Sequence, residues 1–513
     1  MTSNVEIMAN SPQSSVATFY EKMRENFLVP LENCVFPSSI SLLIFGFSAI
    51  FFLIFVSVSA VMTAFSIVLF VAGGLMIRYH SILLVFYIFN AVSICYVVVF
   101  YAFFGSEYFL SSNLFELYER AIFYFALGYC SLAIGLRIVL GNRPIAIMSP
   151  DAPMKIEYLL FAYLVFNYIV SSVLIGTGSQ IGYAMALYRD VILYWVILEC
   201  IFQRRGWQYV LLLIFLIAVP GATSHRSEWS LPLFVVGFSI LIFAMSNEDK
   251  PGLEKYRSKL ILLSAILVLL LGGLGVFWNG GLKSSWRYAV TSGAVGESTV
   301  GRLEALPDFI DRAAEKFRFE VAAESFASRL SAGVPFFALV LARVPEITPH
   351  QDGRLILRAA SHVLQPRFLF PDKEDLGSDS DITSEFTGLR VAGVRQNTSI
   401  GLGYIPQFYI DFGVFGVILG SFVLGCMMGL FLLMLRSSAI LPRLAAATWA
   451  AYLTYIFQSH ASDLAKLCGA MVSLGVMFYA FNRMTGPVVR YWLERRQISM
   501  ETGSPGLVEP GRP

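Results

Sequence analysis

Two stretches, Gln365-Pro-Arg-Phe-Leu-Phe-Pro-Asp-Lys373 and Ser399-Ile-Gly-Leu-Gly-Tyr-Ile-Pro-Gln-Phe-Tyr-Ile-Asp-Phe-Gly-Val-Phe-Gly416, close a hydrophilic region that interrupts an otherwise apolar chain. This region runs from Gly280 to Asp411 and contains fourteen Lys and Arg residues. The apolar segments on both sides of it are long enough to cross a bilayer, which takes about 20 residues. The sequence therefore predicts a membrane protein with one large folded loop.

Composition supports this class. Apolar residues make up 57% of the 513 residues and charged residues only 14%, so we expect an all-α polytopic membrane protein. A net charge of +2 gives no reason to expect nucleic acid as a partner. All six cysteines lie outside the hydrophilic region, so neither a disulfide framework nor a cysteine-type metal site is expected, and no cofactor or metal is predicted. The N-terminus lacks the pattern of a cleaved signal peptide.

About twelve membrane spans are predicted. They divide the chain into an N-terminal segment (1–38), a membrane domain of nine spans (39–278), the large loop (279–411), a membrane domain of three spans (412–481) and a partly disordered tail (482–513). The candidate spans are 39–77 (two helices), 81–104, 121–140, 156–176, 182–202, 208–223, 231–245, 259–278, 412–435, 441–458 and 464–481.

Positive charge predicts the orientation of these spans. With the N-terminus in the cytoplasm, eighteen Lys and Arg residues of the short loops and tail lie inside and only four lie outside. Both termini are then cytoplasmic, and the large loop lies outside, which in a bacterium is the periplasm. For a bacterial chain the expected location is therefore the inner membrane, with the lipid bilayer as a partner.

Within the loop, Pro307–Leu330 has the pattern of an amphipathic helix. Gly333–Val344 is apolar but too short to span, which favours an interfacial or re-entrant segment. Asp379-Ser-Asp381 matches the metal-binding acidic motif of nucleotide-sugar glycosyltransferases. Three residues of an acidic loop are a weak match, however, and we interpret them as a solvated turn.

Several cations are candidates for binding an anion. Pro366 and Pro371 fix the backbone around Arg367 and Lys373. Arg offers a planar fork suited to phosphate oxygens, and Lys offers a compact charge. The alternative is a salt bridge of Lys373 with a neighbouring carboxylate. Arg329 and Arg226 are further candidates; Arg226 could instead reach the membrane surface and pair with Glu228.

Candidate general bases are His362 and Asp411. Asp411 is favoured because it lies at the mouth of a predicted span, beside Tyr409 and Gly413. Most histidines and carboxylates of a polar loop are merely solvated. The other residues considered are Asp372, Glu385, His460 and Asp463.

Three segments of the chain resemble the bacterial O-antigen and exopolysaccharide polymerase family (Wzy-type), which is related to the O-antigen ligases. The residues are Thr223-Ser-His-Arg226 before an apolar helix, Pro366-Arg-Phe-Leu-Phe-Pro-Asp-Lys373, and Thr398 to Gly416 with its Tyr409, Phe412, Gly413 and Gly416. His225 and Ser227 depart from the small residues usual in the first segment.

This resemblance implies a GT-C-like helical glycosyltransferase that polymerises lipid-linked oligosaccharide repeat units. The implied donor and acceptor are glycans on polyprenyl pyrophosphate, and a chain-length regulator and a flippase are implied partners. Arg226, Arg367 and Lys373 would bind the pyrophosphate with help from Arg329, while Asp411 or His362 would act as base. The alternatives are an O-antigen ligase and, at a greater distance, a twelve-span transporter or flippase. A transporter commonly shows two similar halves, and here the halves differ.

Overall fold

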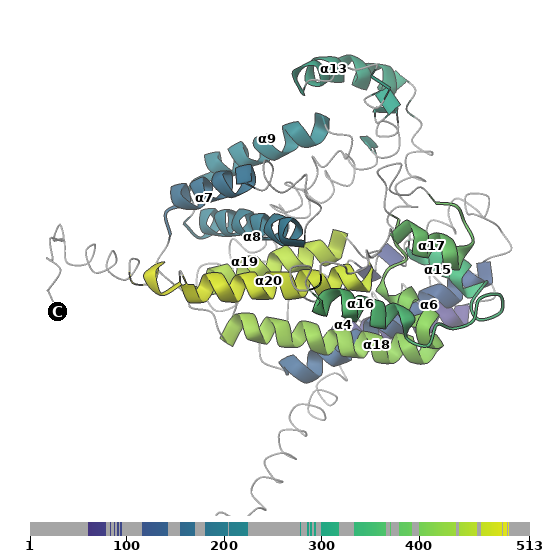
Figure 1. The fold of residues 1–513 in the computed structure, drawn as a ribbon. Helices are drawn as coiled ribbons and strands as arrows, with labels where there is room; N and C mark the ends of the chain where they lie inside the picture. The colour runs from purple at the N-terminus through teal and green to yellow at the C-terminus, as the bar shows by residue number, and fades with distance from the viewer. Residues whose placement is uncertain are drawn as a thin grey trace, which may run out of the picture.

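The computed structural model describes residues 60–77, 115–141, 154–169, 180–203, 205–223, 299–315, 333–365, 379–391, 400–437, 441–458 and 463–489 without 485, together with isolated positions between them. These residues contain helices and no β-strand (Figure 1). The helices are α4 (Ala60–Met76), α6 (Phe115–Leu140), α7 (Ile156–Ile169), α8 (Gln180–Gln203), α9 (Trp207–Thr223), α13 (Thr299–Glu315), α15 (Gly333–Leu341), α16 (Arg354–Leu364), α17 (Asp379–Thr387), α18 (Tyr404–Ser437), α19 (Pro442–Gln458) and α20 (Leu464–Met484).

Helices α6, α18 and α20 are long and apolar enough to cross a membrane. Their candidate spans are Glu116–Leu140, Tyr404–Ser437 and Leu464–Met484. Shorter apolar helices occur at Phe65–Met76, Ile156–Tyr168 and Trp207–Leu216. The predicted all-helical membrane class is therefore confirmed in its coarse form. The number of twelve spans stays a prediction, because 39–59, 231–245, 259–276 and most of 81–104 lie outside the described residues.

Helices α6 and α18 approach each other closely through small residues. A Cβ added to Gly425 would collide with the carbonyl oxygen of Leu132, and one added to Gly135 would collide with that of Phe422. The Cys426 thiol donates to the Gly135 carbonyl, with a sulfur–oxygen distance of 3.6 Å. Such contacts are typical of helices associated in a membrane, where dispersion and close backbone approach replace the hydrophobic driving force.

A buried ion pair joins α8 to α19. Arg443 donates from Nη1 to both carboxylate oxygens of Glu199 at 2.7 Å, and the two residues are 244 positions apart. Gln203 donates to the same carboxylate at 2.8 Å and to the Met154 carbonyl at 2.6 Å, which adds the start of α7 to the network. The last turn of α8 therefore lies beside the first turn of α19.

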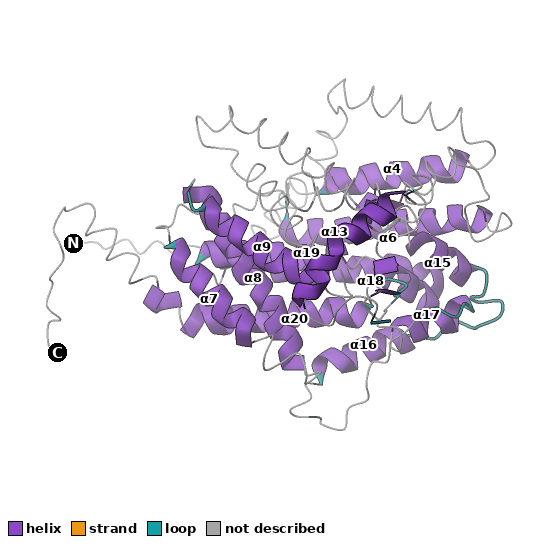
Figure 2. Ribbon diagram, turned by 90° about the horizontal axis from the view of Figure 1, so that it is seen from above, coloured by secondary structure: helices purple, strands orange, loops and turns teal. Residues whose placement is uncertain are grey.

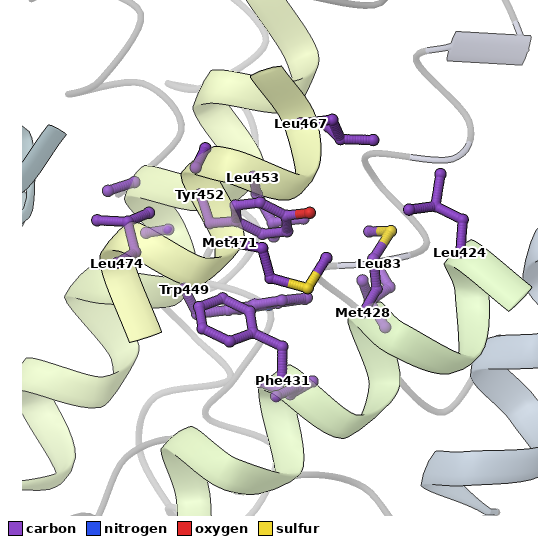
Figure 3. Packing of buried hydrophobic residues seen from close by; sticks show 14 of the residues in the cluster. Leu83, Leu424, Met428, Phe431, Trp449, Tyr452, Leu453, Leu467, Met471 and Leu474 are labelled. Carbon is purple, nitrogen blue, oxygen red and sulfur yellow. The ribbon is translucent and has the colours of Figure 1, made fainter. Parts of the chain in front are cut away.

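The C-terminal helices share one apolar core. Figure 3 shows side chains of α18, α19 and α20 meeting around Phe431 and Met471. The Phe431 ring packs against Tyr452 with centroids 5.2 Å apart and against Trp449 at 6.0 Å. Tyr452, Trp449 and Leu474 are each at most 1% exposed. Since these helices also bury apolar side chains of α6 and α8, the core extends through most of the bundle.

The contacts between paired helices show whether the two helices run in the same or in opposite directions. Helices α6 and α18 run in the same direction, since Gly128 faces Ser421, Leu132 faces Gly425 and Val139 faces Gly429. Helices α8 and α19 run in opposite directions, and so do α19 and α20, because the Leu441 N–H lies 3.4 Å from Asn482 Oδ1. The twelve predicted spans would give the same directions, but the number of spans stays a prediction. Which end faces outward stays a prediction.

The helices of the hydrophilic region differ from their sequence-based expectations. Helix α13 begins at Thr299 and contains Pro307 in its interior, whereas the predicted helix began there. Helix α15 is covered by protein, since Val334, Phe337 and Val340 are at most 1% exposed; whether it is interfacial or re-entrant stays a prediction. Figures 1 and 2 show α15, α16 and α17 gathered near one end of α6 and α18, whereas α13 lies apart, beside α9 in Figure 1.

Filling the contact between α6 and α18 should destabilise the protein. Gly425→Leu places a large side chain against the Leu132 backbone, and we expect a loss of about 1–3 kcal/mol or more. The measurement is the unfolding midpoint of the detergent-purified protein. Val423→Leu, at an exposed position of the same helix, is the matched control and should leave the midpoint unchanged. Equal midpoints for the two variants would contradict the proposed packing.

Breaking the buried ion pair should cost more than replacing it. Glu199→Leu leaves the Arg443 guanidinium without its carboxylate, and a loss of roughly 3–5 kcal/mol is expected. The double variant Glu199→Leu/Arg443→Met removes both charges and should recover most of that loss. A double-mutant cycle of unfolding midpoints tests this expectation, and additive effects would show that the pair contributes nothing.

Candidate functional site

The start of α16 is capped by a carboxylate from α18. Its own N-cap position is Gly353, which has φ 89° and no side chain to accept a hydrogen bond. Asp411 supplies the missing acceptors: Oδ1 accepts the Leu355 N–H at 3.1 Å and Oδ2 accepts the Ile356 N–H at 2.8 Å. A helix start leaves N–H groups without partners and carries partial positive charge, so a carboxylate stabilises it.

Backbone hydrogen bonds join the same two segments. The Gln351 N–H donates to the Ile410 carbonyl at 3.0 Å, and the Asp352 N–H donates to the Asp411 carbonyl at 3.2 Å. Directly afterwards, α18 is interrupted at Phe412 and Gly413. Gly413 adopts φ 62° and ψ −148°, a conformation that residues with a side chain rarely adopt. The turn before α16 and the break in α18 therefore form one unit.

Aromatic side chains surround this unit. The Tyr409 ring stacks on Tyr124 of α6 at 5.5 Å, meets Phe337 of α15 edge-on at 5.5 Å and meets the His350 ring at 5.7 Å. Its hydroxyl donates to the Val344 carbonyl at 3.4 Å. One side chain thus contacts the membrane bundle and two parts of the hydrophilic region, which holds α15 in place.

Helix α17 is attached to the start of α20. Asp379, the first residue of α17, forms an ion pair with Lys466. Asp463 precedes α20, and its Oδ1 accepts the Ala465 N–H at 3.0 Å, while Gln407 of α18 accepts the Leu464 N–H at 3.0 Å. Burial raises the pKa of the Asp463 carboxyl and the nearby charge of Asp379 raises it further, whereas hydrogen bonds and the Lys466 charge lower it.

Asp379-Ser-Asp381 is therefore not a solvated turn. Asp379 and Ser380 are buried, and Ser380 Oγ accepts the Ile400 N–H at 3.0 Å. Thr383 Oγ1 donates to the Ile400 carbonyl at 2.7 Å. Helix α17 thus holds the backbone that leads into α18. Asp379 is paired with Lys466, and Asp379 and exposed Asp381 both lie in the first turn of α17, where a helix start favours negative charge.

Helices α16 and α17 are also joined directly. Arg354 Nη2 donates to Glu385 Oε1 at 2.7 Å, and the Arg354 guanidinium lies 5.9 Å from the centroid of the Phe386 ring. Further along α16, Val363 lies beside Gly469 of α20. The last turn of α16 and the first residue of α17 therefore both lie beside α20.

The predicted site residues fall into two groups. Asp411 and His362 are described by the structure: Asp411 is 0% exposed, and His362 is half-buried near the end of α16. Arg226, Arg329, Arg367 and Lys373 lie outside the described residues. The structure therefore places the two candidate bases but brings together none of the predicted cations.

The geometry favours a structural role for Asp411. Both of its carboxylate oxygens accept backbone N–H groups, and no part of the side chain is exposed. His362 lies in the last turn of α16, at the other end of the helix from the Asp411 cap. Of the two candidates, His362 is the one whose side chain retains access to solvent.

Sequence reasoning did not identify Lys466, Gln407 or Gly353 as parts of this junction. Lys466 is one of the four cations that the charge pattern places outside, and the sequence gives it no other role. Its position three residues after Asp463 places it in the first turn of α20. The glycine before Arg354 was the one available signal, because a helix start without a polar cap residue requires a partner from elsewhere.

Comparison with known proteins adds no further identification: no family model, no curated protein and no solved structure matches the chain.

Removing the Asp411 cap should destabilise the start of α16. Asp411→Ala leaves two buried N–H groups unpaired, and we expect a loss of about 1–3 kcal/mol for each group. Asp411→Asn keeps one acceptor oxygen, so its stability should lie between that of Asp411→Ala and that of the parent protein. Thermal unfolding and hydrogen exchange of peptides covering 354–358 measure both effects. Asp352→Asn is the control, because Asp352 is exposed and Asn tolerates its φ of 49°; unchanged exchange in Asp411→Ala would refute the cap.

Proposed function

We propose that this protein polymerises lipid-linked oligosaccharide repeat units into a surface polysaccharide, either an O-antigen or an exopolysaccharide. The reaction takes place at the periplasmic face of a bacterial inner membrane. Its donor is a growing glycan on polyprenyl pyrophosphate, and its acceptor is a single lipid-linked repeat unit. No cofactor or metal takes part in this proposal.

One observation supports the proposal most. Helices α15, α16 and α17 of the hydrophilic region are packed on the ends of α6, α18 and α20 through Tyr409, Asp411 and the Asp379–Lys466 pair. Leu364 and Asp379, which lie on either side of the segment 366–378, are at the ends of helices held in this way. A diphosphate that leaves a lipid-linked donor remains at the membrane surface, so cations in that segment can meet it there.

The proposed reaction is a substitution at the anomeric carbon of the donor. A hydroxyl oxygen of the acceptor sugar forms the new bond to that carbon, and the bond between that carbon and the phosphate oxygen breaks. The polyprenyl pyrophosphate leaves with the bonding electron pair, and the base takes the hydroxyl proton. Positive side chains stabilise the charge that develops on the diphosphate.

Residue roles follow from this chemistry and from the observed contacts. Arg226, Arg367 and Lys373 bind the diphosphate, and Arg329 assists. His362 is the proposed base, since it lies on α16 directly before Pro366 and retains exposure to solvent. Asp411 positions α16 through its cap, so it acts on the reaction indirectly.

The second candidate is an O-antigen ligase, which would transfer a finished glycan to a lipid A core. Both enzymes need the same diphosphate-binding cations. The products of a deletion strain separate them: loss of a polymerase leaves a single repeat unit attached to the core, whereas loss of a ligase leaves none. A transporter or flippase is a third candidate, and it would form no glycosidic bond in a purified system.

Replacing the proposed diphosphate-binding residues should abolish polymerisation. Purified protein incubated with a lipid-linked repeat unit is expected to produce a ladder of oligomers on a gel. Arg367→Ala and Arg226→Ala should lower the rate by about 100-fold or more, because each removes a charge-assisted contact to the leaving group. Arg390→Ala, an exposed arginine of the same region, is the control and should retain the ladder.

The outcomes are distinct. A normal ladder from both arginine variants would refute the site assignment. No ladder from the parent protein, under conditions where it binds the substrate, would refute the polymerase function itself.

A further inference from the structure

Helix α16 has an apolar surface that is wider than its contact with the rest of the protein. At 100° per residue, Leu355 and Ala359 lie on the buried side, facing α18 and α20. Leu357, Ala360 and Leu364 continue the apolar surface around the helix and are exposed. Leu357 is 68% exposed and Leu364 is 75% exposed.

The polar surface of α16 is directed elsewhere. At 100° per residue, Arg354, Arg358 and Ser361 form a polar stripe whose centre lies about 90° around the helix from that of Leu357, Ala360 and Leu364. Arg354 reaches Glu385 of α17 at 2.7 Å, so this side faces the hydrophilic region. The helix therefore separates two surroundings: α17 on its polar side and no described part of the chain on its exposed apolar side.

The exposed apolar stripe continues the outer surface of α18. Gly353, one turn before Leu357, lies against the Phe412 ring; a Cβ there would be 2.9 Å from Phe412 Cζ. Phe412 itself is 46% exposed. Beyond it, Phe415, Leu419 and Val423 are exposed along a helix that is long and apolar enough to span a membrane. A single apolar surface thus runs from α16 onto a membrane span.

Water is an unfavourable environment for such a surface. Exposed apolar patches of this kind mark contact with a partner or with lipid. Because the patch is continuous with the outer face of α18, the same environment covers both. For the outer face of a membrane span, that environment is the acyl chains of the bilayer.

We propose that α16 is embedded in the bilayer edge, with Leu357, Ala360 and Leu364 in contact with lipid acyl chains. The hydrophilic region is then anchored in the membrane through one of its own helices. The occupant is the bilayer itself, and the contact exists whether or not the chain is a polymerase. Since α16 ends at Leu364, the backbone that follows it starts at the level of the membrane surface.

Spin-label accessibility tests this placement. Leu357→Cys and Leu364→Cys are introduced separately into a chain whose six cysteines have been replaced, after that chain has been shown to elute and melt like its parent. The labelled proteins are reconstituted into phosphatidylcholine/phosphatidylglycerol vesicles. Collision rates are measured with oxygen, which concentrates in acyl chains, and with a water-soluble nickel chelate.

Two further positions calibrate the measurement. Leu419→Cys on α18 reports the lipid environment, and Arg390→Cys after α17 reports the aqueous one. At Leu357 and Leu364 the ratio of oxygen to nickel collisions should exceed that at Arg390 severalfold and lie below that at Leu419, which is deeper in the bilayer.

Other outcomes overturn the proposal. A ratio equal to that at Arg390 shows that water covers the stripe. Low collision rates with both reagents show that a second copy or another protein covers it. If either labelled variant fails to fold, Ala360→Cys replaces it, because Ala360 lies in the same stripe and its side chain is small.

Discussion

The Asp411 carboxylate and the two N–H groups of α16 form the contact on which the arrangement of the hydrophilic region depends. Helix α16 begins after a left-handed turn, at a glycine that offers no cap. Without a partner, the first N–H groups of a buried helix start would carry a desolvation cost. Asp411 removes this cost from a position 56 residues further along the chain, just before the break in α18. The loop and the membrane helix therefore take their positions from each other.

This dependence ties the helices α15, α16 and α17 of the hydrophilic region to the membrane bundle. Helix α15 contributes Phe337 to an aromatic group that includes Tyr124 of α6 and Tyr409 of α18. Helix α17 depends on Lys466 of α20 and on the backbone at Ile400. The buried apolar residues of α15, α16 and α17 belong to the core of the bundle. A separate, smaller cluster forms around Trp286, which packs against Phe309 of α13 with ring centroids 5.0 Å apart.

Much of the fold follows from local sequence patterns, and the tertiary contacts do not. Apolar length predicts α6, α18 and α20 to within a few residues at the ends nearest Leu140, Leu435 and Phe481, because bilayer thickness sets the length of a span. The start of α18 differs from the predicted start at residue 412. The segment Tyr404–Asp411 is already helical before the break, and apolar length alone does not predict this earlier helical segment. The ion pair between Glu199 and Arg443 could not be predicted, because nothing in the sequence near either residue indicates its partner. For α15 the sequence does not distinguish burial by protein from burial by lipid, because both select apolar side chains.

The candidate site shows the same division. His362 and Asp411 could be named from their residue types, yet the role of Asp411 depends on which N–H groups lie beside it. A carboxylate that caps a helix and a carboxylate that accepts a proton are identical in sequence. Only the distance to Leu355 and Ile356 separates them.

The parallel pairing of α6 with α18 has a consequence for biosynthesis. The glycine-lined surface of α6 leaves the ribosome more than 250 residues before Gly425, its partner, has been made. Helices inserted one at a time can associate only after their partners have entered the bilayer. During that interval α6 presents to lipid a surface shaped for another helix. Assembly of the bundle must therefore await the C-terminal spans, and a chain released early would be inserted yet unassembled, as a substrate for membrane quality control.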